Sequence, residues 1–278
     1  VQELISAIRL WEQQSDYDML RSEYLDLGNA YENFEKTDEA ITAYQQSLQI
    51  CQENKDTQHQ IWPLCRIGEV YIERKDYSAA IIFIEKAFHL AIEIKEADDI
   101  SYTGGLLTML FELIENWDSC IFYSLKLLEL PIEFFSSQDM LLIYIRLADS
   151  YAGKEEFVLA KTYYDQVIAL ARKNSDWSYL AYAAFARGMV YEKLQDEEGM
   201  MASYHEVLNA GDNCVLPKGL IGWSLFDIGK IYQKRGEFDT AQKYISDSLI
   251  QFKKESDEDS QISAYRSLAF IYHESGNT

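Results

Sequence analysis

The chain has 278 residues and a formal net charge of −21, from 46 acidic and 25 basic side chains. A chain this acidic repels nucleic-acid phosphates and anionic membranes. We therefore expect neither nucleic acid nor a membrane among its partners. The acidic side chains either keep an apolar-rich chain in solution or steer a basic partner towards it. No run of about 18 apolar residues is present, which predicts no membrane insertion.

Residues 1–16 are predicted to form one helix, with Ala7 at a small-residue position that recurs later in the chain. No partner helix precedes it, and the sequence does not begin with methionine. We therefore expect this helix to be the second half of a partial repeat, and the chain to be a piece of a longer protein.

From residue 28 onwards one pattern recurs every 40 residues, with a single step of 41. An anchor position, small in most copies, is followed three residues later by an aromatic ring. The anchor positions are Gly28, Gly68, Thr108, Ala148, Gly188, Gly229 and Ala269. The aromatic residues are Tyr31, Tyr71, Phe111, Tyr151, Tyr191, Tyr232 and Tyr272. Seven copies in register indicate a repeat protein.

Helix packing explains the pattern. Twelve and nineteen residues after most anchors stand further small residues, such as Ala40 and Ser47 after Gly28. Two antiparallel helices can cross closely only where their side chains are small. The two later positions are seven residues apart, so they lie on one face of the second helix. The aromatic ring then fills the space beside the anchor, as part of the core.

Six full repeats of two helices each are expected, followed by one more first helix that is cut off. The expected repeats cover residues 20–55, 61–95, 100–130, 139–174, 179–209 and 220–254, and the truncated repeat covers residues 261–278. The third repeat carries Gly104 and Gly105 in its first helix, either for tight packing against a neighbour or for a ligand contact.

A large apolar residue, such as Leu27, also precedes most anchors. The combined pattern resembles the tetratricopeptide repeat family, which has the same apolar, anchor, aromatic and small positions. The period of 40 differs from the usual period of about 34 and is similar to the long repeats of kinesin light chains and bacterial peptide-sensing regulators. HEAT and armadillo repeats have a period near 40 but lack these small positions. The resemblance implies an all-α fold, a right-handed α-solenoid of antiparallel helix pairs that runs as one domain through residues 1–278.

In this family the first helix of each repeat lines a concave groove, which places certain positions around each anchor in that groove. The candidate partner-binding residues are Trp62, Cys65, Glu69, Tyr102, Met109, Ile145, Asp149, Tyr182, Phe185, Met189, Trp223, Phe226 and Lys230. This groove is aromatic and apolar, with isolated acids at Glu69 and Asp149. It suits an amphipathic helix or an extended apolar peptide with a basic residue. Alternatively, some of the aromatic side chains pack between repeats.

The sequence predicts no enzyme, because it contains no glycine-rich phosphate loop, no GxSxG motif and no paired nucleophile and base. We expect no cofactor and no metal site. Its cysteines, Cys51, Cys65, Cys120 and Cys214, form neither a CxxC motif nor a zinc-binding spacing with histidine. They indicate free thiols in a reducing compartment, which suggests a cytoplasmic protein.

These features favour a non-catalytic scaffold that binds a partner helix or peptide in its concave groove. A second hypothesis is a ligand-sensing regulatory module of a larger protein whose effector domain lies outside this chain. A third is a structural spacer, which self-associates through exposed terminal repeats.

Overall fold

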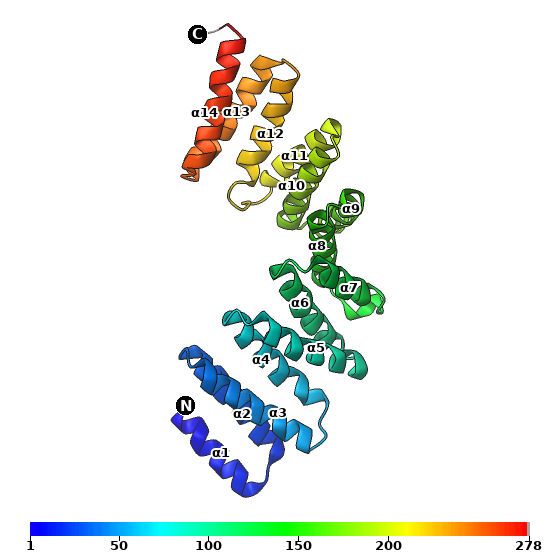
Figure 1. The fold of residues 1–278 in the computed structure, drawn as a ribbon, viewed down its shortest axis with the longest axis vertical. Helices are drawn as coiled ribbons and strands as arrows, with labels where there is room; N and C mark the ends of the chain where they lie inside the picture. Colours follow the sequence, from blue (N-terminus) through cyan, green and yellow to red (C-terminus); the bar gives the residue numbers. More distant parts are fainter. Residues whose placement is uncertain (277–278) are drawn as a thin grey trace. The chain divides into compact units, whose positions relative to one another are not determined.

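The computed structural model describes residues 1–276, so the end of the truncated repeat expected over residues 261–278 lies outside the described residues. The chain divides into two compact units, unit 1 (Val1–Asp139) and unit 2 (Met140–Thr278), and each is described by itself. The boundary falls in the first turn of α8 (Ser137–Gly153). Figure 1 shows the helices of both units.

Unit 1 is a stack of antiparallel helices in which each helix packs on the next, as α2 does on α3 and α4 on α5. Two 3-10 helices, η1 (Gln58–Gln60) and η2 (Ile132–Phe134), lie in the connections. The α-helices are α1 (Gln2–Gln14), α2 (Tyr17–Asn33), α3 (Thr37–Glu53), α4 (Ile61–Glu73), α5 (Tyr77–Ile94), α6 (Ala97–Leu113) and α7 (Trp117–Leu128).

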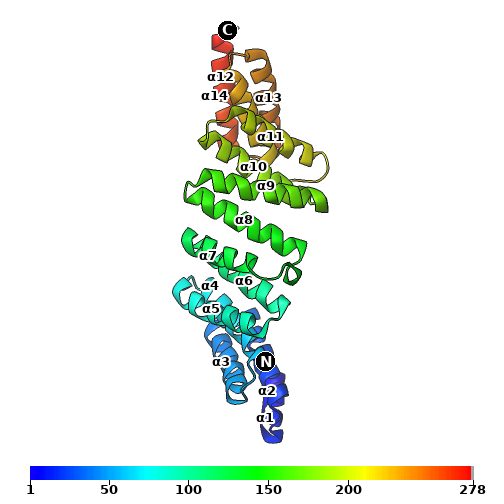
Figure 2. The same ribbon diagram turned by 90° about the vertical axis from the view of Figure 1, so that its right-hand side faces the viewer.

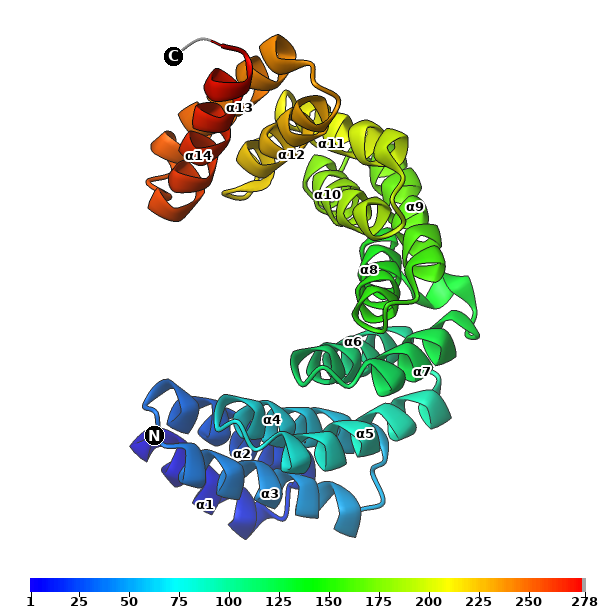
Figure 3. The ribbon, with the colours of Figure 1, turned by 45° about the horizontal axis from the view of Figure 1, so that its top comes forward.

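Unit 2 continues from α8 in the same manner, and Figure 2 shows α9 beside α10. Its first-in-pair helices α10, α12 and α14 are neighbours, with α12 between the other two (Figure 3). The helices after α8 are α9 (Phe157–Asn174), α10 (Trp177–Lys193), α11 (Glu197–Gly211), α12 (Leu220–Lys234), α13 (Phe238–Lys254) and α14 (Glu258–Glu274). The predicted all-α fold of paired helices is confirmed. The description of the chain as one continuous domain stays a prediction.

The anchor glycines lie against a large side chain sixteen residues later, a position that the sequence analysis did not single out. A methyl group on Gly28 would lie 2.3 Å from the ring of Tyr44, and one on Gly188 would lie 2.5 Å from the ring of Tyr204. Gly68 and Gly229 pack on isoleucines at the same offset. Glycine is therefore needed here to admit the neighbouring helix.

The aromatic residue after most anchors is partly buried, and in four repeats it stacks on another ring of the second helix. The centroid distances are 5.7 Å for Tyr71–Phe83, 5.4 Å for Phe111–Tyr123, 5.6 Å for Tyr151–Tyr163 and 5.6 Å for Tyr232–Tyr244. Offset ring pairs of this kind add stability beyond their buried area. The rings therefore hold the two helices of a repeat together at the end where they meet.

The turn between the two helices of a repeat has the same geometry in both units. A residue with positive φ, such as Lys75 at 61° or Gln195 at 58°, ends the first helix. The next residue, Asp76 or Asp196, donates its backbone N–H to the carbonyl of the repeat's aromatic residue. Its carboxylate then accepts the N–H of the third residue of the second helix. This left-handed end followed by an N-cap fixes the angle between the paired helices.

The two glycines of the third repeat have different surroundings. A methyl group on Gly104 would lie 2.6 Å from Leu127, whereas one on Gly105 would meet no atom within 4 Å. The helix runs through both without interruption. Tight packing therefore accounts for Gly104. It does not account for Gly105.

Across the residues that the structure describes, no helix is both long and apolar enough to cross a membrane.

Candidate functional site

In unit 1 the predicted groove residues Glu69 and Tyr102 belong to a hydrogen-bonded network with Arg66 at its centre. The Tyr102 hydroxyl donates to Glu69 Oε1 at 2.5 Å, and Arg66 Nη1 donates to Glu69 Oε2 at 2.7 Å. The other guanidinium nitrogens of Arg66 reach Glu32 and, at 3.3 Å, the hydroxyl of Tyr44. Glu69 is therefore a paired carboxylate rather than the isolated acid that the sequence suggested.

Tyr44 connects this network to the core, because its ring packs on Gly28 and its hydroxyl contacts Arg66. The hydroxyl lies within hydrogen-bond distance of two acceptors, the Glu32 carboxylate and, at 2.8 Å, Asn29 Oδ1. Burial, together with the hydrogen bond to Glu32, raises the pKa of Tyr44 well above its usual range. One cation thus lies between two carboxylates and a neutral phenol, so the guanidinium offsets part of the negative charge of this centre.

In unit 2 the predicted residues Asp149 and Tyr182 also pair. The hydroxyl of Tyr182 donates to Asp149 Oδ2 at 2.7 Å, and that of Tyr164 donates to Oδ1 at 2.5 Å. Burial raises the pKa of Asp149, while the two tyrosine hydroxyls and nearby Arg146 oppose that rise. Tyr182 and Asp149 are 33 residues apart, as Tyr102 and Glu69 are, so the tyrosine–carboxylate contact recurs between successive repeats.

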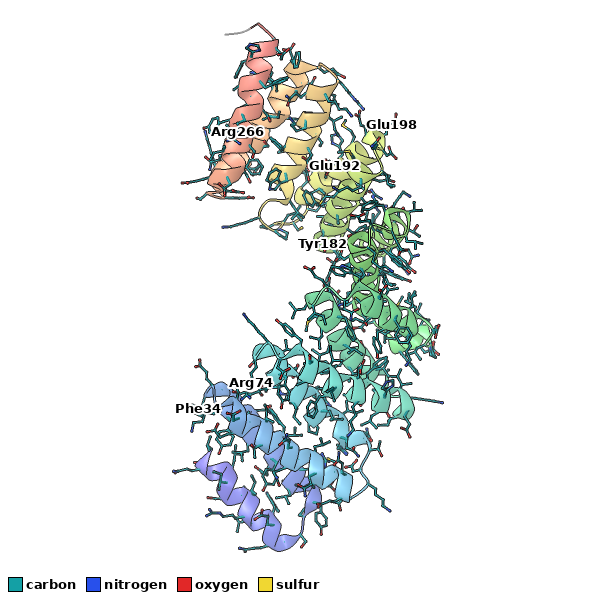
Figure 4. All side chains as sticks on the ribbon, viewed as in Figure 1. Phe34, Arg74, Tyr182, Glu192, Glu198 and Arg266 are labelled. Carbon is teal, nitrogen blue, oxygen red and sulfur yellow. The ribbon has the colours of Figure 1, made fainter. Side chains whose placement is uncertain are left out.

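The remaining predicted residues differ widely in exposure. Cys65 and Ile145 are buried, at 0% and 8% exposed, because they lie on the side of the first helix that packs on its neighbours. We leave both out of the site proposed below. The exposed ones are Trp62 at 47%, Met109 at 37%, Tyr182 at 41% and Met189 at 51%, together with Lys230. Figure 4 labels Tyr182 on α10.

Two hollows in unit 2 each bring together two of the predicted residues. The larger, about 650 Å³, is lined by Phe226 and Lys230, and the smaller, about 330 Å³, by Phe185 and Trp223. Trp223 also packs edge-on against Phe226, with ring centroids 5.5 Å apart. The smaller hollow is bounded by Gly219, whose N–H donates to the Glu255 carboxylate at 2.9 Å.

The larger hollow, which we call the α12 cavity, is formed by α10, α11, α12 and α14. Its apolar lining includes Met200, Phe226 and Phe270. Its charged lining consists of Glu192, Glu197, Asp227, Lys230 and Lys234. Ligand sites of this volume typically combine an apolar wall with a few polar groups that fix orientation. The α12 cavity has that composition.

Of the carboxylates that line the α12 cavity, Glu197 is paired with two cations, whereas Asp227 is a partly buried carboxyl beside another acid, Glu192. Glu197 binds Lys234 Nζ at 2.5 Å and Arg235 Nε at 3.3 Å. Burial, helped by nearby Glu192, raises the pKa of Asp227 to about 6, against the hydrogen bond from Tyr204 and the charge of Lys230. Lys230 itself extends to Gln233, which accepts a hydrogen bond from its Nζ at 3.1 Å. The wall therefore carries a carboxyl that is costly to ionise in the free protein.

Sequence analysis missed Asp227, Glu192 and the tyrosines Tyr44, Tyr164 and Tyr204. A signal for the tyrosines was present, because each stands sixteen residues after an anchor. Glu192 stands four residues after the anchor Gly188, and Asp227 stands two residues before the next anchor, Gly229. The sequence analysis did not connect these two positions. Among the described residues no three His, Cys, Asp or Glu side chains gather that could hold a metal ion.

Family models for the tetratricopeptide repeat match residues 18–93 and 141–174 of this chain. The resemblance stated from the sequence is thereby confirmed. No curated protein sequence matches the chain.

Solved structures with the same fold include the apo form of RapI, at 14% identity and a TM-score of 0.68, over 96% of this chain and 79% of RapI. A STAND signal-transduction ATPase with a tetratricopeptide repeat sensor, from Pyrococcus horikoshii, matches at 15% identity and a TM-score of 0.60. That match covers 97% of this chain and 40% of the ATPase. YrrB, a tetratricopeptide repeat protein with an unusual peptide-binding site, matches at 15% identity and a TM-score of 0.52, over 73% of this chain and 92% of YrrB. At such identities the likeness shows the fold alone.

Proposed function

We propose that this chain, in which residues 18–93 and 141–174 match tetratricopeptide repeat models, is a non-catalytic scaffold that binds a peptide or a protein segment. The observation that carries the proposal is the α12 cavity, which offers about 650 Å³ of space beside Phe226, Phe270 and the partly buried carboxyl of Asp227. Helix pairs that hold aromatic side chains beside polar groups can take up the side chains of an extended or helical segment. YrrB, which has this fold, is described as having a peptide-binding site, and that description supports the same role here.

The other predicted groove positions belong to the proposal as outlying contacts. Trp62 and Tyr102 lie with ring centroids 5.0 Å apart, and Trp62 is 47% exposed. Met109 and Met189 add flexible apolar surface, which adapts readily to different partners. We place the protein in the cytoplasm, a proposal supported by its four free cysteines.

Selection from a random peptide library would test the binding proposal. Phe270 lines the α12 cavity and is 49% exposed, so Phe270→Ala removes a contact surface without opening a core. Phe122 on α7 is 59% exposed and serves as the matched control. We expect the wild-type chain and Phe122→Ala to enrich the same peptides, and Phe270→Ala to bind them at least about tenfold more weakly. Enrichment of no peptide, or equal binding by all three proteins, would contradict the proposal.

A second candidate role is that of a sensor module in a larger protein. This role is favoured by the match of 97% of this chain to 40% of an ATPase that carries a tetratricopeptide repeat sensor. A sensor requires that the ligand favour one arrangement of the repeats. Hydrogen exchange should then change in helices that do not touch the selected peptide. Protection confined to the helices around the α12 cavity would leave only the scaffold role.

Self-association through a terminal repeat is a further part of the proposal. The last helix, α14, leaves Ile262, Tyr265, Phe270 and Tyr272 between 40% and 50% exposed. Paired apolar faces of this kind stack in repeat proteins. Sedimentation at increasing concentration should show a dimer that Ile262→Lys abolishes. A monomer at every concentration would exclude it.

A further inference from the structure

The two units place different residues at one equivalent position of the repeat. Arg66 and Asp227 each stand two residues before an anchor glycine, Gly68 and Gly229. In unit 1 the residues around Arg66 are Tyr44 and Glu32, from the preceding repeat. In unit 2 the residues around Asp227 are Tyr204 and Glu192, which occupy the same repeat positions as Tyr44 and Glu32.

The backbone framework of the two centres is also the same. Tyr44 packs on Gly28 and Tyr204 packs on Gly188, with a would-be methyl group 2.3 Å and 2.5 Å from the respective rings. Both tyrosines are buried, at 0% and 1% exposed, with their hydroxyl groups directed to the next repeat. The hydroxyl of one therefore meets a guanidinium, and the hydroxyl of the other meets a carboxyl.

In unit 1 the cation of this arrangement contacts the carboxylates directly, whereas the cation of unit 2, Lys230, hydrogen-bonds to Gln233. The guanidinium of Arg66 binds Glu32, Glu69 and the hydroxyl of Tyr44. In unit 2 the charges are reversed, because Asp227 replaces Arg66 and Lys230 stands in the place of Glu69. The ammonium of Lys230 extends along α12 to Gln233 at 3.1 Å. The unit 1 equivalent of Glu192 is Glu32, which binds the guanidinium of Arg66. The unit 1 equivalent of Asp227 is Arg66 itself.

The cavity beside Asp227 has room for an arginine side chain. Its volume, about 650 Å³, exceeds that of one side chain, and Phe226, Phe270 and Met200 line it together with the two acids. An arginine side chain combines an apolar stem, which packs on such a wall, with a planar cation that stacks on aromatic rings and binds carboxylates. Charge and shape therefore both match.

We propose that the α12 cavity binds an arginine side chain of a peptide ligand, with the guanidinium between Asp227 and Glu192 and the stem against Phe226 and Phe270. The bound arginine takes the place that Arg66 occupies in unit 1. This inference rests on the proposed function, since it names the side chain by which the peptide is recognised.

The pKa of Asp227 predicts that the affinity for an arginine peptide depends on pH. The groups that face Asp227 are Glu192 on α10, Tyr204 on α11 and Lys230 on α12, while α14 contributes Phe270 to the cavity. Burial raises the pKa of Asp227 to about 6, so the free protein holds a proton there below that pH. A bound guanidinium favours the carboxylate. Affinity should therefore rise with pH and be about tenfold weaker at pH 5 than at pH 7.

Peptides selected from the random library on the wild-type chain provide the test. We expect arginine to be enriched at one position among them, and replacement of that arginine by citrulline, which has the same shape without the charge, to weaken binding about tenfold or more. Asp227→Asn should bind the arginine and citrulline peptides equally. Glu198→Gln, an exposed change on α11 outside the cavity, should keep the wild-type preference (Figure 4).

The outcomes separate this inference from the proposed function. Selected peptides that lack arginine, or that bind equally well with citrulline, would overturn the inference while the peptide-binding function stands. An arginine preference that survives in Asp227→Asn would place the guanidinium elsewhere and also overturn it. If no peptide is enriched, the proposed function and the inference fail together. Circular dichroism of each variant confirms that it is folded.

Discussion

The centres around Arg66 in unit 1 and around Asp227 in unit 2 use the same positions of the repeat and differ in charge. The first has a guanidinium with two carboxylates around it, and the second has a carboxyl beside another acid. The glycine–tyrosine packing beneath them is unchanged. The comparison teaches that the packing beneath the two centres is constant, while the residue two before the anchor sets the charge above it. In the proposal above, a ligand supplies to unit 2 the guanidinium that unit 1 carries as Arg66.

The largest expected effect is on the stability of the centre around Arg66 in unit 1. Arg66→Met keeps an apolar stem over the ring of Tyr44 but leaves Glu32 and Glu69 without their cation. We expect a loss of about 3 kcal/mol in the free energy of unfolding, measured by urea denaturation. Arg74→Met is the control, since Arg74 pairs with Asp38, whose side chain is 88% exposed, and it should cost less than about 1 kcal/mol. Similar small losses in both variants would remove the distinction between the two centres.

Asp227→Asn should have the opposite effect in unit 2 and stabilise the fold at neutral pH. A folded-state pKa of about 6, above the ordinary value of Asp, means that ionisation destabilises the fold as the pH rises through that range. Asparagine cannot ionise and still accepts the hydrogen bond from Tyr204. We expect a gain of about 2 kcal/mol above pH 7 that disappears near pH 4.

Unfolding of wild type and variant across this pH range measures the effect of Asp227→Asn. Asp212 is exposed in the connection after α11 and gives a matched control. Asp212→Asn should not alter the pH dependence of the free energy of unfolding. An Asp227→Asn protein that is no more stable than wild type at pH 7 would contradict a strained carboxyl at this position.

Asp227→Arg would transfer the unit 1 arrangement to unit 2. The new guanidinium should pair with Glu192 and Tyr204 as Arg66 pairs with Glu32 and Tyr44, and stabilise the fold by about 1 kcal/mol. Because it occupies the place of the ligand's arginine, the variant should also lose its preference for the arginine peptide over the citrulline peptide. Fluorescence polarisation with both peptides measures this. A retained preference would show that the two centres are not equivalent.

The smallest expected effect concerns the feature that the two units share. Tyr102→Phe and Tyr182→Phe each remove one hydroxyl from a carboxylate that keeps another partner, Arg66 on Glu69 and Tyr164 on Asp149. Each should cost about 0.5–1 kcal/mol in urea denaturation. Tyr265→Phe on α14, where the ring is 50% exposed, is the control and should cost nothing measurable. A large loss in only one of the two would show that this contact differs between the units.

The fold could be predicted because its determinants recur with a fixed period. A small anchor recurs in most repeats and an aromatic ring three residues later recurs in all of them, since each repeat packs on its neighbours in the same manner. The candidate site could be predicted only in part. Phe226 and Lys230 follow from the family's groove positions, and they do line the α12 cavity.

Asp227 could not be found in this way, because nothing periodic identifies a position where one repeat has arginine and another aspartate. Its environment depends on Glu192 and Tyr204, which come from the previous repeat. Cys65 and Ile145 were placed in the groove by the same positional rule. Phe185 and Phe226 stand at the same repeat position and line the two hollows, so the position in the repeat does not by itself decide which side chains are accessible.

The most direct test of the account is the titration of the Asp227 carboxyl by NMR, with carbon-13 in the aspartate side chains and Asp227→Asn to assign the signal. In the free protein the pKa should be about 6. With a saturating arginine peptide it should fall towards the ordinary value of about 4, because the guanidinium stabilises the carboxylate. With a citrulline peptide it should stay near 6. A pKa that is unchanged by the arginine peptide would contradict the claim that the α12 cavity receives the cation that unit 1 carries within its own chain.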